Sequence, residues 1–204
     1  RRALRAHREL TVALTVVSLG SSFAAGPFLP PVVDADAGRS GRNYPHLTAA
    51  RLGAELVDLT VSGATTATIL DQAQTTTTSG KVYAPQLEGV PRDADVVTVT
   101  AGGNDLDYTG SMLFAAFRRL DPAHPLNGYL APRFPDGLQQ PSAAMVETAE
   151  SGLVRIVEEV RIRTDDARIV LVDNLTVIGG GAGGATLFDD AERDLLLRMR
   201  ASLE

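Results

Sequence analysis

The chain has 204 residues, of which 44% are hydrophobic and 22% charged, and its net charge is -6. This length and composition are typical of a globular protein with an adequate core, and we expect a single domain over residues 1–204. The negative charge, without a basic stripe, argues against a nucleic-acid-binding surface. Cysteine is absent, which excludes disulfides, a thiolate nucleophile and cysteine-ligated metals, and leaves both a secreted and a cytoplasmic location open.

The first twenty-five residues imitate a signal peptide. Basic residues between Arg1 and Arg8 precede an apolar run over 10–19, and small residues follow it. The β-branched residues of that run favour a buried strand instead, which we expect over 11–19. No apolar run approaches the roughly 18 residues of a membrane span, so no transmembrane segment is predicted.

Apolar runs separated by turn residues predict strands that alternate with helices. We expect strands over 11–19, 55–59, 95–100 and 168–172, and helices over 45–52, 66–73, 111–120, 143–164 and 188–203. We expect loops over 26–42, 75–80 and 179–184, and a proline-rich surface insertion over 121–141. Such alternation predicts the α/β class, with right-handed crossovers and a parallel sheet covered by helices on both faces.

A glycine-containing turn follows each of the first three strands. The turns are Leu19-Gly20-Ser21-Ser22, Ser62-Gly63-Ala64-Thr65 and Gly102-Gly103-Asn104-Asp105. In a parallel sheet the carboxyl ends of the strands share one edge, where ligands bind. We therefore expect the three turns to meet at one site.

Each turn offers one group suited to acyl-ester chemistry. Ser22 supplies a hydroxyl that a neighbouring base would activate as a nucleophile. Gly63 supplies a backbone N–H that a substrate oxygen can approach closely, and Asn104 supplies a side-chain amide that can donate to an oxyanion. Taken alone, the first two motifs are more often ordinary turns, and the third is the most specific of them.

The three blocks resemble those of the SGNH (GDSL-type) hydrolases, in the family's order and at family-like spacing. Val17–Gly26 looks like the nucleophile block, Val61–Thr65 like the second block and Ala101–Asp105 like the third. The resemblance implies a flavodoxin-like three-layer α/β/α sandwich with no metal or other cofactor. It also implies that Ser22 is the nucleophile and that its own N–H, the Gly63 N–H and the Asn104 amide form an oxyanion hole.

Two departures from the family stand out. Ser21 occupies the position where the family usually has Asp, a residue thought to organise the turn. We identify no Asp-x-x-His block in the chain, although the family carries its base and the orienting acid in such a block near the C-terminus. We expect His7, His46 and His124 to be solvent-exposed structural residues, and we expect the base to lie beyond residue 204 in the intact protein.

The sequence therefore predicts a carboxylic-ester hydrolase, an esterase or lipase acting on a small-molecule or lipid ester. Three alternatives stay open: a catalytically silent relative that binds acyl or glycan ligands, an acyltransferase, and an unrelated binding domain in which Ser22 and Asn104 do not converge. The glycine run at 179–184 lacks the Lys-Ser/Thr ending of a phosphate-binding loop and reads as a flexible loop. The sequence does not indicate the oligomeric state.

Overall fold

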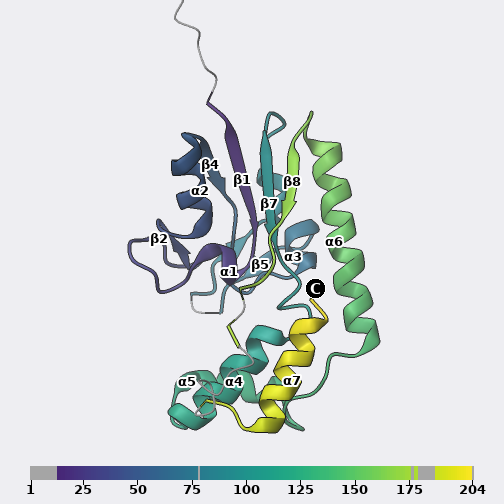
Figure 1. Cartoon of the computed structure of the whole chain (residues 1–204). Coiled ribbons are helices and arrows are strands. Elements are labelled where there is room, and N and C mark those ends of the chain that lie inside the picture. Colours follow the sequence, from purple (N-terminus) through teal and green to yellow (C-terminus); the bar gives the residue numbers. More distant parts are fainter. Residues whose placement is uncertain (1–12, 78, 176, 179–186, 204) are drawn as a thin grey trace, which may run out of the picture.

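A computed structural model describes residues 13–77, 79–175, 177–178 and 187–203. Its centre is a four-stranded sheet in the order β4-β1-β7-β8, and each neighbouring pair of strands is parallel (Figure 1). The strands are β1 (Thr15–Gly20), β4 (Glu55–Asp58), β7 (Val96–Thr100) and β8 (Arg168–Leu171). The predicted α/β class with a parallel sheet is confirmed. The assignment to one domain over the whole chain stays a prediction.

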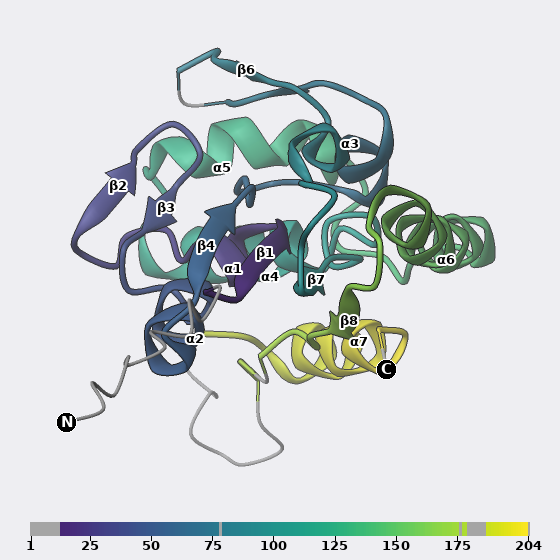
Figure 2. The ribbon, with the colours of Figure 1, turned by 90° about the horizontal axis from the view of Figure 1, so that it is seen from above.

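Helices cover both faces of the sheet, as the view along the strands shows (Figure 2). One face carries α3 (Thr66–Leu70), η1 (Gln86–Gly89) and α6 (Ala143–Arg163), and the other carries α2 (Tyr44–Leu52). The remaining elements are α1 (Ser22–Ala25), β2 (Val32–Asp34), β3 (Arg39–Ser40), β5 (Gln74–Thr75), β6 (Val82–Tyr83), α4 (Tyr108–Leu120), α5 (Pro125–Leu130), η2 (Ala131–Arg133) and α7 (Asp190–Ala201). No helix in the described part of the chain is long and apolar enough to cross a bilayer.

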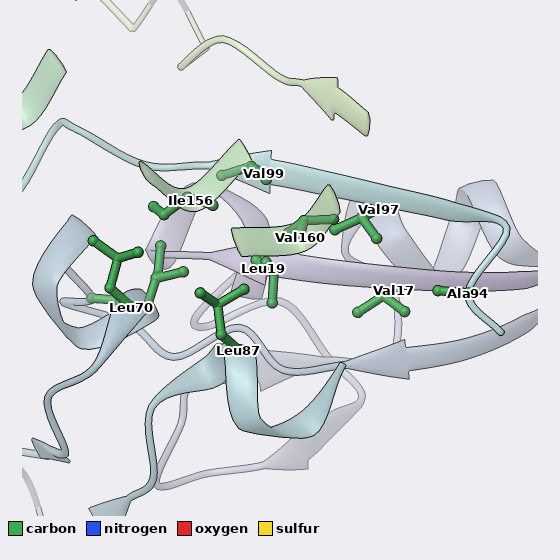
Figure 3. Packing of buried hydrophobic residues seen from close by; sticks show 11 residues of the cluster. Val17, Leu19, Leu70, Leu87, Ala94, Val97, Val99, Ile156 and Val160 are labelled. Atoms are coloured by element: carbon green, nitrogen blue, oxygen red, sulfur yellow. The ribbon is translucent and has the colours of Figure 1, made fainter. Parts of the chain in front are cut away.

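The face under α3, η1 and α6 is apolar. Alternate residues of β1 and β7 point into it, because side chains of a strand alternate between the two faces. Val17, Leu19 and Val97 are fully buried there, and Val99 is 2% exposed. Figure 3 shows these side chains around Ile156 and Val160 of α6, with Leu87 of η1 near Leu19. This cluster is the main hydrophobic core.

The opposite face of the same two strands carries buried hydroxyl groups. The Thr98 hydroxyl donates to Ser18 Oγ over 3.0 Å, and the Tyr44 hydroxyl of α2 lies 2.9 Å from Thr100 Oγ1 and 3.3 Å from Thr98 Oγ1. Ser18 is fully buried and Thr98 and Thr100 are nearly so. Helix α2 is therefore attached to the sheet through a polar network.

Several predicted boundaries were wrong by a few residues. Strand β1 runs from Thr15 to Gly20, and residues 11–12 of the predicted strand lie outside the described residues. Helix α3 ends at Leu70 instead of residue 73. The predicted loop at 26–42 contains β2 and β3, which pair as a hairpin, whereas the predicted loop at 75–80 begins on the last residue of β5 and ends before β6, its hairpin partner. The predicted loop at 179–184 lies outside the described residues.

The proline-rich segment 121–141 is more than the surface insertion that we predicted. It forms α5 and η2, and it buries Leu130 and Phe134 against Phe114 of α4. The Phe114 and Phe134 rings stack with their centroids 5.2 Å apart. Together with α4 and α7 the segment makes a second helical layer beyond the carboxyl ends of the strands (Figure 1). Pro125 and Pro132 stand in the first turns of α5 and η2, where proline is tolerated, so they do not prevent these helices from forming.

Candidate active site

The first turn leaves the sheet at Gly20, where only glycine fits. Its φ is +145°, and a Cβ built on it would lie 2.4 Å from the Thr100 carbonyl oxygen. The Ser21 N–H then donates to the same Thr100 oxygen over 3.0 Å. Ser22 begins the one-turn helix α1, and its side chain is half-buried. The predicted nucleophile thus lies directly beyond the end of β1.

Ser21, which stands where the family usually has Asp, is 3% exposed. Its carbonyl oxygen accepts from the Ala24 and Ala25 N–H groups, but its side chain makes no capping hydrogen bond to α1. The backbone therefore holds this turn without a contribution from the Ser21 hydroxyl to the helix N-terminus.

The second turn follows β4 and leads into α3. Gly63 has φ +84°, the left-handed region that favours glycine. The Ser62 N–H donates to the Ala37 carbonyl over 2.8 Å, and Gln74 Nε2 donates to the Ser62 carbonyl over 2.8 Å. Thr65 then begins α3 with a capping box. The β2–β3 and β5–β6 hairpins thus hold this turn from two sides.

The third turn follows β7 and contains the Asn104 amide. Asn104 Nδ2 donates to the Ala64 carbonyl of the second turn over 2.8 Å. An amide nitrogen carries two hydrogens, and among the described residues the second hydrogen of Asn104 Nδ2 has no acceptor. The Asp105 carboxylate accepts from the Thr66 N–H and hydroxyl at the start of α3, over 3.0 and 2.6 Å. These bonds hold the third turn against the second.

Hydrogen bonds therefore connect all three turns. Gly20 and Thr100 are register partners, and the Val61 N–H donates to the Gly20 carbonyl over 3.0 Å. The first turn is thus bonded to the end of β7 at Thr100 and to Val61, the residue before the second turn, while Asn104 bonds the third turn directly to Ala64 of the second. The three turns lie together at the carboxyl edge of the sheet.

Two further side chains at this edge were missed by the sequence analysis. Gln86, which is 4% exposed, bonds with its side-chain amide to both backbone polar groups of Gly20. Asn174, after β8, lies against Gly103, and its Oδ1 is buried without a partner among the described residues. Gln86 reaches the site through the backbone of Gly20, and Asn174 does so because it follows β8 and lies against Gly103. A single sequence does not show either contact.

His46 has an acidic partner that sequence spacing did not show. Its Nδ1 lies 3.6 Å from Asp58 Oδ2, at the end of β4, and 2.7 Å from Asn43 Oδ1. Asn43 Nδ2 donates to Asp58 and to the Ala25 carbonyl, so its Oδ1 is the acceptor and the His46 Nδ1 carries the proton. His46 is therefore part of the bonding that holds α2 to α1, with its side chain 31% exposed.

The spacing Asp-x-x-His does occur, at Asp121-Pro122-Ala123-His124, and the sequence analysis passed over it. The two side chains serve the turn between α4 and α5. Asp121 Oδ1 accepts from the Ala123 N–H, while His124 Nδ1 accepts from the Leu126 N–H and its ring stacks on Phe117 at 4.2 Å. This turn lies at the far end of α4 from Asn104, a helix of 13 residues that spans about 20 Å. His7 lies outside the described residues.

A charged cluster supports the second turn from the hairpins. Arg39 Nε donates to the Thr60 carbonyl over 2.6 Å, and Asp34 accepts from the Tyr83 hydroxyl over 2.9 Å while facing Arg39 and Lys81. Burial alone would raise the pKa of the Asp34 carboxyl. The hydrogen bonds from Ala37 and Tyr83, with the two cations, lower this pKa below its ordinary value.

A cavity of about 330 Å³ lies beside this cluster, and none of the predicted site residues lines it. Its lining residues are Arg39, Leu59, Val61, Tyr83, Ala84, Pro85, Gln86, Glu88 and Gly89. Among the residues that the structure describes, no three His, Asp or Glu side chains gather into a possible metal site.

Residues 18–202 match the model of the GDSL-like lipase/acylhydrolase family, and the chain belongs to that family. It is 39% identical over 99 residues to Lipase 2 of Streptomyces coelicolor, a match that covers 48% of this chain and 32% of that protein. The matched part thus spans about a third of the length of this curated relative.

Two solved structures share the fold. The extracellular lipase from Streptomyces rimosus superposes with a TM-score of 0.63 at 20% identity, over 94% of this chain and 73% of that one. Phospholipase A1 from Streptomyces albidoflavus NA297 gives a TM-score of 0.64 at 21% identity, over 94% and 72%. At these identities the likeness establishes the SGNH-type α/β fold alone.

Proposed function

We propose that the chain carries the nucleophile and the oxyanion hole of a carboxylic-ester hydrolase. In this proposal Ser22 Oγ attacks the ester carbonyl carbon, while the oxygen of that carbonyl becomes an oxyanion. The Ser22 N–H, the Gly63 N–H and the second hydrogen of the Asn104 amide donate to the oxyanion. Collapse of the intermediate expels the alcohol and leaves an acyl group on Ser22, which water then hydrolyses.

The hydrogen bonds that hold the three turns together carry this proposal. Catalysis requires donors that are oriented before the reaction begins, because their reorientation would otherwise cost free energy in the transition state. Asn104 is fixed by Ala64, and the Gly63 turn is held by Ala37 and Gln74. The backbone around Ser22 is fixed by Thr100 and Val61. Membership in a lipase and acylhydrolase family supports ester chemistry at such a site.

The hydroxyl proton of Ser22 must pass to a base. We propose that this base is a histidine, the residue that the Asp-x-x-His block supplies in the family that the sequence resembles. His124 is unsuited, since its Nδ1 is engaged by Leu126 at the far end of α4. His46, with Asp58 in reach, is the described histidine whose role needs a direct test.

The substrate is a small-molecule or lipid ester in this proposal. The names of the relatives, lipase and phospholipase A1, favour lipid esters. A silent acyl- or glycan-binding relative and an acyltransferase remain the rival functions, and they differ from a hydrolase in measurable ways. A silent relative releases no alcohol, and an acyltransferase releases it faster when an acceptor alcohol is added.

The first experiment measures p-nitrophenyl butyrate hydrolysis by the protein at its natural length and by residues 1–204, each beside Ser22→Ala. We expect activity in the natural protein that Ser22→Ala abolishes and that Asn104→Ala lowers about 10²–10³-fold in kcat. Ser151→Ala, a serine exposed on α6, is the matched control and keeps full activity. Activity that survives Ser22→Ala would refute the proposal.

The same assay tests His46. We expect His46→Gln to change kcat by less than about threefold, since the imidazole serves the Asn43 network in our interpretation. If His46→Gln in the 204-residue chain lowers kcat by several orders of magnitude and removes the acid limb of the pH–rate profile, His46 is the base.

A further inference from the structure

Gln86 is a buried polar side chain that contacts the turn leading from β1 to Ser22. It is the first residue of η1 and is 4% exposed. The Gly20 N–H donates to its Oε1 over 2.8 Å, and its Nε2 donates to the Gly20 carbonyl over 3.0 Å. The amide thus bonds to the two peptide groups on either side of one residue, 66 positions earlier in the chain.

The sheet leaves the Gly20 N–H without a strand partner among the described residues, whereas the Gly20 carbonyl also accepts from the Val61 N–H over 3.0 Å. The paired register of β1 and β4 ends at Ser18 and Asp58, after which only the Leu59 and Val61 N–H groups reach β1. The Gly20 N–H would otherwise be a buried donor without an acceptor, which is unfavourable. A side-chain amide offers one acceptor and two donors in a fixed geometry, so Gln86 replaces the missing peptide group of a neighbouring strand.

Gly20 is also the point from which the chain turns toward Ser22. Without a Cβ, and at φ +145°, its backbone has more conformational freedom than any other residue type would allow. The two bonds to Gln86 fix the peptide planes before and after Gly20. They thereby set the direction in which Ser21 and Ser22 leave the strand. Leu87, the residue after Gln86, packs in the main core and so holds η1 in place (Figure 3).

We propose that Gln86 is a positioning residue for the nucleophile, fixing Ser22 Oγ and the Ser22 N–H through its two hydrogen bonds to Gly20. The inference rests on the proposed ester hydrolysis. Gln86 touches neither substrate nor reacting atoms. Its effect is on the rate of the chemical step, because a misplacement of about 1 Å in a reacting group can cost about 10²-fold in rate.

The test compares Gln86→Leu with Val160→Ala in the protein at its natural length. Val160 is fully buried on α6 near the carboxyl-terminal end of that helix, so its truncation lowers stability without touching Gly20. Both are assayed where circular dichroism shows them folded. We expect Gln86→Leu to lower kcat, and the rate of Ser22 labelling by a fluorophosphonate, by about tenfold to a hundredfold with KM changed less than about twofold. Val160→Ala keeps the wild-type kcat.

Gln86→Glu provides a second signature. A protonated carboxyl group accepts from the Gly20 N–H and donates to the Gly20 carbonyl as the amide does, whereas a carboxylate repels that carbonyl oxygen. Burial keeps such a carboxyl protonated to a higher pH than in water. We expect kcat of Gln86→Glu, divided by the wild-type value at the same pH, to fall as the pH rises from 6 to 9.

The outcomes separate the two proposals. If the wild-type protein neither hydrolyses ester nor reacts with the fluorophosphonate, the proposed function fails, and the role of Gln86 fails with it. If the wild type is active but Gln86→Leu matches Val160→Ala, or the Gln86→Glu ratio is independent of pH and close to one, only the Gln86 inference is overturned. If Gln86→Leu does not fold, the Gln86→Glu ratio decides.

Discussion

The two faces of the central sheet are built from the same strands but are held by different interactions. Val17, Leu19 and their β7 neighbours bury aliphatic groups under α3, η1 and α6. On the other face, Thr98 and Thr100 contact the Tyr44 hydroxyl of α2, and Thr98 donates to Ser18. Burial of aliphatic groups is roughly proportional to area and has no preferred direction, whereas hydrogen bonds fix orientation.

Side chains from both faces of the sheet bond to the segment that contains Ser22. From the apolar side, η1 presents Gln86 to the Gly20 backbone. From the polar side, Asn43 at the start of α2 donates to the Ala25 carbonyl at the end of α1. Side-chain amides from both faces of the sheet, those of Gln86 and Asn43, therefore hold the turn that contains Ser22. We therefore expect α2 to orient the turn around Ser22 and the apolar layer to supply most of the stability.

Truncation on the apolar face is expected to have the largest effect on stability. Leu19→Ala removes a fully buried side chain from the main core, and we expect the free energy of unfolding to fall by about 2–5 kcal/mol. Urea denaturation followed by circular dichroism measures it. A loss below about 1 kcal/mol would show that this face is not the main source of stability.

Removal of a hydroxyl from the polar face should cost less. Thr98→Val keeps the volume but leaves Ser18 Oγ buried without its donor, and we expect a loss of about 1–3 kcal/mol. The matched double variant Ser18→Ala/Thr98→Val removes both partners and should lose less than the sum of the single changes. Additive losses in the denaturation series would contradict a direct bond between the two hydroxyls.

Tyr44→Phe tests whether the polar face orients α2. The ring stays in place while the contacts to Thr98 and Thr100 are lost, so we expect a loss of about 0.5–1.5 kcal/mol. Hydrogen exchange at the backbone amides of α2 should rise more than at those of α6. Equal changes in both helices would mean that the hydroxyl contacts do not attach α2 specifically.

We expect the smallest effect on the free energy of unfolding from the charged cluster around Asp34. This cluster lies outside both faces of the sheet, and its contribution to stability depends on pH. Because the folded state lowers the pKa of Asp34, its stabilising contribution is present above the unfolded pKa, about 3.9, and is lost as the pH falls through the folded value. Asp34→Asn should lower the free energy of unfolding by less than about 1 kcal/mol at pH 6, with the difference shrinking toward pH 2. A constant difference across this range would contradict the assigned pKa direction.

Local sequence signals predicted the strands and the turns well. Strands 55–59, 95–100 and 168–172 end within one residue of the observed strands, since β-branched runs and glycine punctuation are local properties. The insertion at 121–141 was misjudged because its prolines are visible in the sequence, whereas the stacking of Phe134 on Phe114 is a long-range contact. The pairing of His46 with Asp58 was invisible for the same reason.

The sequence by itself determined the α/β class, the family resemblance and the candidate residues Ser22, Gly63 and Asn104, because each depends on residue types within a few positions of one another. Only the tertiary structure decided how the three turns are joined and which side chains support them. Asn104 finds Ala64 forty positions away, and Gln86 finds Gly20 sixty-six positions away. Parallel strands bring their carboxyl ends together and bury backbone N–H and C=O groups there. These groups need hydrogen-bond partners, which residues distant in the sequence supply in the folded chain.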